Sequence, residues 1–119
     1  MRILIKKDPR YPLDVKEIRS IAKSILSNYD LPDEIELSIN FVGKRKAKSL
    51  NEDYRNKDYI PKVLAFPMNE KGPDGVLRLG DLVICFPLAR KEARQRQRMV
   101  NEIIEELLEH GMNNLLREL

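Results

Sequence analysis

Apolar residues recur along the first half of the chain at intervals that predict two strands and one helix. Residues 2–6 (RILIK) form a short β-rich run, and residues 35–42 (IELSINFV) alternate apolar and polar side chains, which is typical of strands. Residues 15–26 repeat apolar side chains every three or four positions after Asp14, a good helix N-cap. This spacing predicts an amphipathic helix.

The second half of the chain predicts two more strands and three helices. After Gly43, the residues Ala47, Leu50 and Tyr54 fall at helical spacing, which favours a short helix with a basic outer face. Residues 63–66 and 79–86 are apolar, strand-like runs, separated by a loop over residues 68–76 that is rich in Gly, Pro and Asp. Pro87 suits the first turn of a helix that continues through residues 88–97, and a last helix spans about residues 100–116.

The resulting order β-α-β-α-β-β-α-α predicts an α+β fold, in which helices pack on a mixed four-stranded sheet. A loop rather than a helix joins the strands predicted at residues 63–66 and 79–86, so we expect these two strands to pair antiparallel. The chain shows no internal repeat and no linker. We therefore expect one domain over residues 1–119.

Composition narrows the class of protein. The 119 residues are 42% hydrophobic and 34% charged, which is typical of a globular chain. No apolar run is long enough to span a membrane, and charge follows the first five residues, so a transmembrane protein and a secretory signal are not expected. The single cysteine, Cys85, excludes a disulfide scaffold and a Cys-rich zinc finger, and its apolar neighbours predict a small buried side chain. We expect a cytoplasmic protein that has no membrane partner.

Charge is unevenly distributed along the chain. The net charge is +3, yet residues 99–119 hold one basic and five acidic residues, while residues 1–98 hold 21 basic and 14 acidic ones. A basic body is a weak indication of a phosphate-bearing partner, and an ordinary solvated surface is the alternative interpretation.

The only histidine, His110, lies at the edge of the apolar stripe that Ile103 and Leu107 form on the last predicted helix. Asn114 follows four residues later and Glu106 precedes by four, so both lie one turn away on the same face. A histidine and a second ligand at this spacing can hold one metal ion, but a neutral amide is a poor zinc ligand. The residues alone equally allow a packed, hydrogen-bonded histidine.

Three ordered stretches carry a family resemblance: LNEDYRNKDYIPKVLAFP (50–67), GDLVIC (80–85) and EHGMNNLL (109–116). Together they resemble the YbeY family, whose pattern reads roughly LNxxYRxKDxPTDVLSFP, then GDIVIC, then HGxLHLxGxDH. The resemblance covers the chain from about Ile35 to its end. It implies a mixed sheet with helices and a metal-dependent endoribonuclease that acts in ribosomal RNA maturation, with RNA or a ribosomal subunit as partner.

The resemblance implies a zinc site with three histidine ligands. The first ligand falls on His110, the second falls on Asn114, and the third would fall one position beyond Leu119. A catalytic zinc normally takes three protein ligands and an open position for water, so we expect no metal to be bound here. Carboxylates contributed across a subunit interface suit harder ions than zinc; the candidates are Glu106, Glu109 and Glu118.

Other positions of the family pattern are partly retained. Arg55 matches an arginine that faces the RNA phosphate near the metal, so the resemblance implies a catalytic role for it, and a planar guanidinium suits phosphate oxygens. Asp81 matches the motif GDLVIC, and we expect it to satisfy backbone groups in a turn. The family's Thr, Asp and Ser in PTDVLSF are replaced here by Pro61, Lys62 and Ala65.

Basic residues around the predicted second and third helices are candidates for RNA binding. Arg90, Arg94 and Arg98 are spaced at i, i+4 and i+8, which would line one helix face and contact phosphates without reading bases. A solvated helix face is the equal alternative. The full candidate set is Lys44, Arg45, Lys46, Lys48, Arg55, Lys57, Arg90, Arg94 and Arg98.

Three hypotheses for function remain open. The chain is a protein of YbeY-like ancestry with little or no hydrolysis, a non-enzymatic RNA- or ribosome-binding domain, or a scaffold with neither activity. A truncated product, an engineered metal-free version and a degenerate natural paralogue would all show this pattern of retained core positions and lost polar ones.

Overall fold

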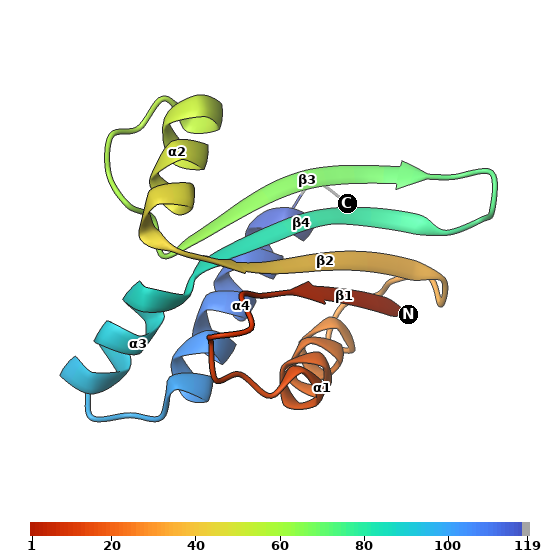
Figure 1. Cartoon of the computed structure of the whole chain (residues 1–119). Coiled ribbons are helices and arrows are strands. Elements are labelled where there is room, and N and C mark those ends of the chain that lie inside the picture. Colours follow the sequence, from red (N-terminus) through yellow and green to blue (C-terminus); the bar gives the residue numbers. More distant parts are fainter. Residues whose placement is uncertain (118–119) are drawn as a thin grey trace.

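The computed structural model of the chain describes residues 1–117, which form eight elements in the predicted order (Figure 1). The elements are β1 (Arg2–Lys6), α1 (Val15–Leu26), β2 (Ile35–Val42), α2 (Lys44–Arg55), β3 (Val63–Lys71), β4 (Leu77–Cys85), α3 (Phe86–Gln95) and α4 (Val100–Leu116). The α+β class predicted from the hydrophobic pattern is confirmed.

The four strands form one mixed sheet in the order β1-β2-β4-β3. Strands β1, β2 and β4 run parallel, and β3 pairs antiparallel with β4 on one edge of the sheet, as predicted for the two strands joined by a loop. The crossovers through α1 and α2 place the carboxyl ends of β2 and β4 at the same end of the sheet. Helices α2 and α3 begin at that end (Figure 1).

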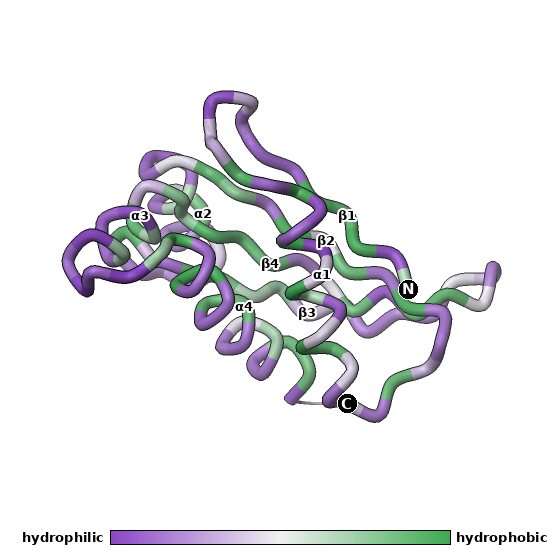
Figure 2. Tube along the Cα trace, turned by 90° about the horizontal axis from the view of Figure 1, so that it is seen from below, coloured by the Kyte–Doolittle hydropathy of each residue, from purple (hydrophilic) through white to green (hydrophobic). Residues whose placement is uncertain are grey.

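The two faces of the sheet are covered differently. Helices α1, α3 and α4 lie on one face and α2 lies on the other (Figure 1). Along β2, the residues Ile35, Leu37, Ile39 and Phe41 are buried in the main core with residues of α1 and α4, and the side chains between them are only half buried. In Figure 2, α4 alternates between apolar and polar positions with each turn. The alternate apolar residues of β2 and the apolar sides of α1 and α4 therefore pack together in one buried layer.

The β3–β4 hairpin is longer than the sequence predicted. Strand β3 continues to Lys71 and β4 begins at Leu77, so only residues 72–76 connect them, where Gly75 turns the chain at a φ of +82°. Pro67 does not end β3, because an edge strand tolerates a residue without an N–H donor. A bulge beside Gly80, whose φ is +139°, keeps the strands paired, and a Cβ there would collide with the Phe66 carbonyl oxygen.

Two further expectations about single residues are corrected. Asp81 lies within β4, opposite Ser38 and Phe66, and therefore does not satisfy the backbone of a turn. Helix α3 ends at Gln95, before Arg98. Within residues 1–117, no helix is both long enough and apolar enough to cross a membrane.

Candidate functional site

His110 and Asn114 lie one turn apart on α4, as their spacing predicted. The side chain of His110 is exposed, and its Nε2 atom lies 3.3 Å from Nδ2 of Asn114. The opposite side of α4 carries the buried stripe that includes Leu108 and Met112. The imidazole of His110 therefore lies at the edge of the core, and its Nε2 atom faces the side-chain amide of Asn114.

His110 borders a hollow of about 470 Å³ between α4 and the segment that connects α2 to β3. Close packing at Gly111 determines how near α4 lies to the sheet. A Cβ at this residue would lie 2.9 Å from Leu82 Cδ2 and 3.2 Å from Val63 Cγ2. The glycine lets α4 approach the β3–β4 pair closely. The lining side chains are Tyr59, Ile60, Pro61, Lys62, Val63, Leu107 and His110.

Arg55 reaches the same region from the end of α2. Helix α2 ends at Arg55 and is capped by Asn56, whose φ is +56°. Nη1 of the Arg55 guanidinium lies 3.5 Å from the Tyr59 hydroxyl oxygen. Tyr59 lines the hollow that His110 also lines. The structure therefore brings Arg55 and His110, the two residues that the resemblance singled out, into the same region. Both side chains are exposed and accessible to a ligand.

Asn51 is a residue of this region that the sequence analysis missed. Its side chain is fully buried, and Nδ2 donates a hydrogen bond of 3.0 Å to the Tyr59 carbonyl oxygen. It thereby ties α2 to the segment that carries Tyr59. The signal available in the sequence was the polar Asn beside Leu50, because a polar residue on the buried side of a helix normally has a hydrogen-bond partner to satisfy.

The residues of this region do not fit a zinc ion. Residues 1–117 contain no group of three or more His, Cys, Asp or Glu side chains arranged to hold a metal. Glu106, one turn before His110, is engaged by Arg96 at 2.7 Å and by Arg98 at 3.2 Å, and Arg96 lowers the pKa of its carboxyl. Glu118 lies outside the described residues. We therefore derive no hydrolytic step through a metal at this position.

Lys62 introduces a positive charge where the family pattern has Asp, but the structure pairs that charge. Its ammonium contacts Glu92 of α3, and Glu92 also accepts a hydrogen bond of 3.0 Å from Arg96. The hydrogen bond from Lys62, supplemented by Arg96, holds the pKa of the Glu92 carboxyl below its usual value. The charge of Lys62 is largely compensated at the wall of the hollow.

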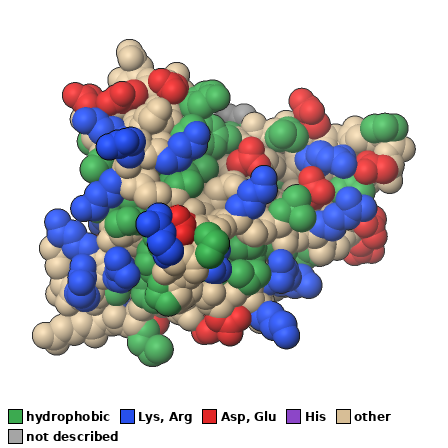
Figure 3. All heavy atoms as spheres, viewed as in Figure 1, with side chains coloured by type: hydrophobic (Ala, Val, Ile, Leu, Met, Phe, Trp, Pro, Cys, Tyr) green, Lys and Arg blue, Asp and Glu red, His purple; other side chains and the backbone are tan. Residues whose placement is uncertain are grey.

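Lys and Arg side chains gather over α2 and α3, at one end of the molecule (Figure 3). Lys44, Arg45 and Lys46 are exposed in the first turn of α2, and Arg90 and Arg94 are exposed on α3. We call these five residues the basic face. The predicted candidates Arg55 and Lys57 are also exposed, whereas Lys48 lies 3.9 Å from Glu52 and 3.6 Å from Asp58.

Arg98 does not continue the ridge formed by Arg90 and Arg94. It lies beyond the end of α3, in the connection to α4, so the helical spacing that grouped the three arginines does not apply. Its guanidinium contacts Glu102 at 2.7 Å and Glu106 at 3.2 Å. The carboxylates at the start of α4 therefore compete with any phosphate for this arginine.

Cys85 is buried at the end of β4, as expected for a small apolar side chain. Burial raises the pKa of its thiol. Since the thiolate is the nucleophilic form, this residue has the character of a core residue rather than a reactive one.

Comparison with known proteins shows that this chain matches one protein family. A family model described as "Endoribonuclease YbeY" matches residues 5–116. Curated relatives with that name occur in Persephonella marina, 36% identical over 117 residues that cover 97% of this chain and 76% of the relative, and in Anaeromyxobacter sp. (strain Fw109-5), 36% identical over 113 residues that cover 95% and 58%.

The chain spans 58% of the length of the Anaeromyxobacter relative and 49% of the length of a relative from Chromobacterium violaceum. Among solved structures, the solution structure of TM1509 from Thermotoga maritima aligns with a TM-score of 0.65 over 95% of this chain and 71% of that one. At 19% identity, this similarity shows a shared fold.

Proposed function

Because the chain belongs to the YbeY family of endoribonucleases, we propose that it binds RNA in the cytoplasm and that its hydrolytic activity is strongly reduced. Ribosomal RNA is the RNA class that the family resemblance favours. The reduced activity follows from Asn114, which places a neutral amide where the family pattern has its second histidine ligand.

The observation that carries RNA binding is the unpaired state of the basic face. Within residues 1–117, none of its five cations forms an ion pair with a carboxylate. Arg90 packs over the Phe86 ring at 5.2 Å, a contact that orients the guanidinium and leaves its charge available. Exposed, uncompensated cations at one end of a protein attract a phosphate backbone.

Arg55 links the basic face to the hollow beside His110. A phosphate that reaches the Tyr59 side of the hollow meets a guanidinium whose planar donors match phosphate oxygens. The exposed imidazole of His110 on the other wall is a further donor or acceptor for the bound backbone. These residues contact the RNA backbone and position it without reading its bases.

Binding is tested by fluorescence anisotropy with a short, unstructured single-stranded RNA at several salt concentrations. We expect the double variant Arg90→Gln/Arg94→Gln to reduce the slope of log K against log salt by about 1.4, because each single-strand phosphate contact contributes about 0.7. The matched control is Arg96→Gln/Arg98→Gln, which removes the same charge from arginines already held by carboxylates. Equal losses in both variants would contradict a specific basic face.

Cleavage distinguishes this proposal from an intact endoribonuclease. We expect the RNA to stay uncleaved when Zn²⁺ or Mn²⁺ is added to the chain. Metal-dependent cleavage that His110→Ala abolishes would show that a working metal site includes His110, and the reduced-activity part of the proposal would then be wrong. Absence of both cleavage and salt-dependent binding would identify the chain as a scaffold.

A further inference from the structure

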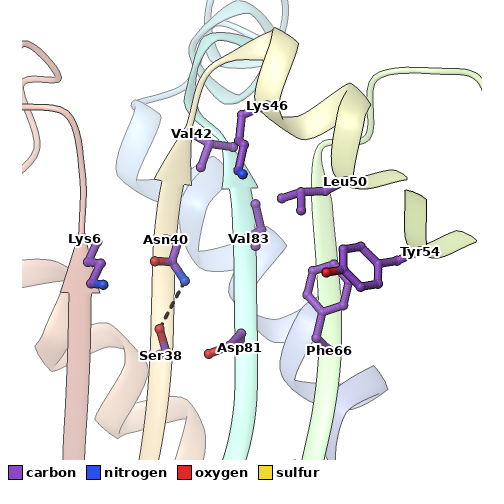
Figure 4. Close-up of a pocket in the computed structure, with 10 residues that line it drawn as sticks. All are labelled: Lys6, Ser38, Asn40, Val42, Lys46, Leu50, Tyr54, Phe66, Asp81 and Val83. Atoms are coloured by element: carbon purple, nitrogen blue, oxygen red, sulfur yellow. Dashed lines mark hydrogen bonds between the residues drawn. The ribbon is translucent and has the colours of Figure 1, made fainter. Parts of the chain in front are cut away.

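A second hollow, of about 490 Å³, lies on the face of the sheet opposite α4, where α2 overhangs the strands (Figure 4). Its volume falls within the range of roughly 300–1,000 Å³ that is typical of small-molecule sites. The side chains come from all four strands and from α2. They are Lys6, Ser38, Asn40, Val42, Lys46, Leu50, Tyr54, Phe66, Asp81 and Val83.

One side of this hollow is an aromatic and aliphatic wall. The rings of Tyr54 and Phe66 meet edge to face, with centroids 5.2 Å apart and an angle of 72° between their planes. Tyr54 is 70% exposed although it is a large aromatic residue, and Leu50 lies one helical turn before it on the same side of α2. An exposed aromatic ring beside an apolar wall is a surface on which a planar heterocycle can stack.

The floor of the hollow is polar. Strand register places Asp81 between Ser38 and Phe66, and its carboxylate points toward the Ser38 side of the floor (Figure 4). Among the ten lining side chains, one hydrogen bond is formed, from Asn40 Nδ2 to Ser38 Oγ at 3.1 Å (Figure 4). The Asp81 carboxylate and the Asn40 amide oxygen therefore remain available as acceptors for N–H groups of a ligand.

Two cations complete the lining from opposite sides. Lys6 stands on β1, and Lys46 projects from α2 toward the sheet (Figure 4). Neither lysine, nor Asp81, forms an ion pair within residues 1–117. The two lysines attract a negatively charged ligand group, whereas the Asp81 carboxylate repels an anion that has no N–H donors. A ligand of this hollow must bring both a negative group and N–H donors.

We propose that this hollow binds a nucleotide. The base stacks against Tyr54, its N–H groups donate to Asp81, and the phosphate contacts Lys6 or Lys46. Guanine fits best, because its adjacent ring N–H and amino group match both oxygens of one carboxylate. The site lies across the sheet from His110, so it is separate from the hollow described above. The proposed function would make the nucleotide part of bound RNA, and a free mononucleotide has the same chemistry.

The experiment is an NMR titration that follows the backbone amides of the chain with GMP, UMP and ribose 5-phosphate. We expect GMP to shift signals around Asp81 and Tyr54, and to bind more tightly than UMP. Ribose 5-phosphate lacks the base, so we expect it to bind at least about fivefold more weakly, given the usual contribution of base stacking. Equal binding of GMP and ribose 5-phosphate would overturn the proposal.

Matched variants separate the hollow from the rest of the surface. Tyr54→Leu should weaken GMP binding at least about fivefold, whereas Tyr59→Leu, at an exposed tyrosine that lines the hollow beside His110 instead, should leave it unchanged. Lys46→Gln should weaken binding about threefold, as for a solvent-exposed charge pair, and Lys48→Gln on the same helix should not. Asp81→Asn should remove the preference for GMP over UMP. Equal effects within the tyrosine pair or the lysine pair would contradict the site.

A short single-stranded RNA distinguishes the two sources of the nucleotide. Displacement of GMP from the hollow by this RNA at lower concentration than GMP itself would identify the ligand as part of an RNA strand, and weaker competition would identify a free nucleotide. RNA binding that depends on Arg90 and Arg94, with no shifts near Asp81 and Tyr54 on addition of GMP, would overturn the nucleotide site and leave the proposed function intact.

Discussion

Asn114 Nδ2 lies 3.3 Å from His110 Nε2, one turn along the same face of α4. When Nε2 carries no proton, it accepts a hydrogen bond from this amide. A metal ion at His110 would have to displace that contact and would find an amide where a second imidazole is needed. The spacing of a two-ligand metal site is thus present, with one ligand of the wrong chemistry.

Asn114→His should restore a pair of metal-binding imidazoles on α4. We expect Zn²⁺ affinity, measured by isothermal titration calorimetry, to rise about tenfold, which corresponds to roughly 1.4 kcal/mol. The control is Asn101→His, the same substitution on the same helix but nine positions before His110, too far along the helix axis for the two imidazoles to share one ion. An equal gain in the two variants would show that the spacing from His110 does not matter.

Gly111→Ala should destabilise the protein although alanine favours helix formation. The added Cβ would lie 2.9 Å from Leu82 Cδ2 and 3.2 Å from Val63 Cγ2, so either these packed side chains or α4 must shift. We expect the free energy of unfolding in urea to fall by about 1–3 kcal/mol, as for other overpacked cores. Asn113→Ala, on the exposed side of α4, should not destabilise the protein. A more stable Gly111→Ala variant would show that the helix has room to shift at no cost.

Asn51→Asp should loosen the segment that carries Tyr59. The carboxylate keeps the size of the amide but cannot donate to the Tyr59 carbonyl, and it places a charge in a fully buried position. We expect a loss of about 1–3 kcal/mol in the free energy of unfolding, together with faster amide hydrogen exchange over residues 56–62. Ser49→Ala on the exposed side of α2 is the control. Unchanged exchange in Asn51→Asp would contradict a role for Asn51 in holding this segment.

Acid should weaken the contact between Glu92 of α3 and Lys62, the residue before β3. Lys62, followed by Arg96, lowers the pKa of Glu92 in the folded state. A depressed folded-state pKa stabilises the protein above the unfolded-state value, and this contribution is lost as pH falls through the folded value. We expect Tm to drop between about pH 5 and about pH 3, and Glu92→Gln to flatten that part of the profile. Glu105→Gln, at an exposed position of α4, should keep the slope. A profile unchanged by Glu92→Gln would contradict this coupling.

Apolar periodicity, apolar runs and the position of Pro87 predicted all eight elements and their order, because each of these signals is a local property of the chain. The ends of β3 and β4 were not predicted, since Met68 and Asn69 look like loop residues until β4 pairs with the strand. The grouping of Arg98 with Arg90 and Arg94 failed for a similar reason. Contacts with Glu102 and Glu106 hold Arg98 in the connection after α3.

The sequence by itself determined the helices, the strands, the antiparallel pairing of β3 with β4, and the spacing of one helical turn between His110 and Asn114. Each of these depends on residues close together in the chain. Only the tertiary structure decided which distant residues meet. It brought Arg55 beside Tyr59 in the region of His110, and it placed Asp81, Phe66 and Tyr54 around one hollow. The physical reason is that strand order and helix placement follow from burying one common apolar layer, which no local spacing encodes.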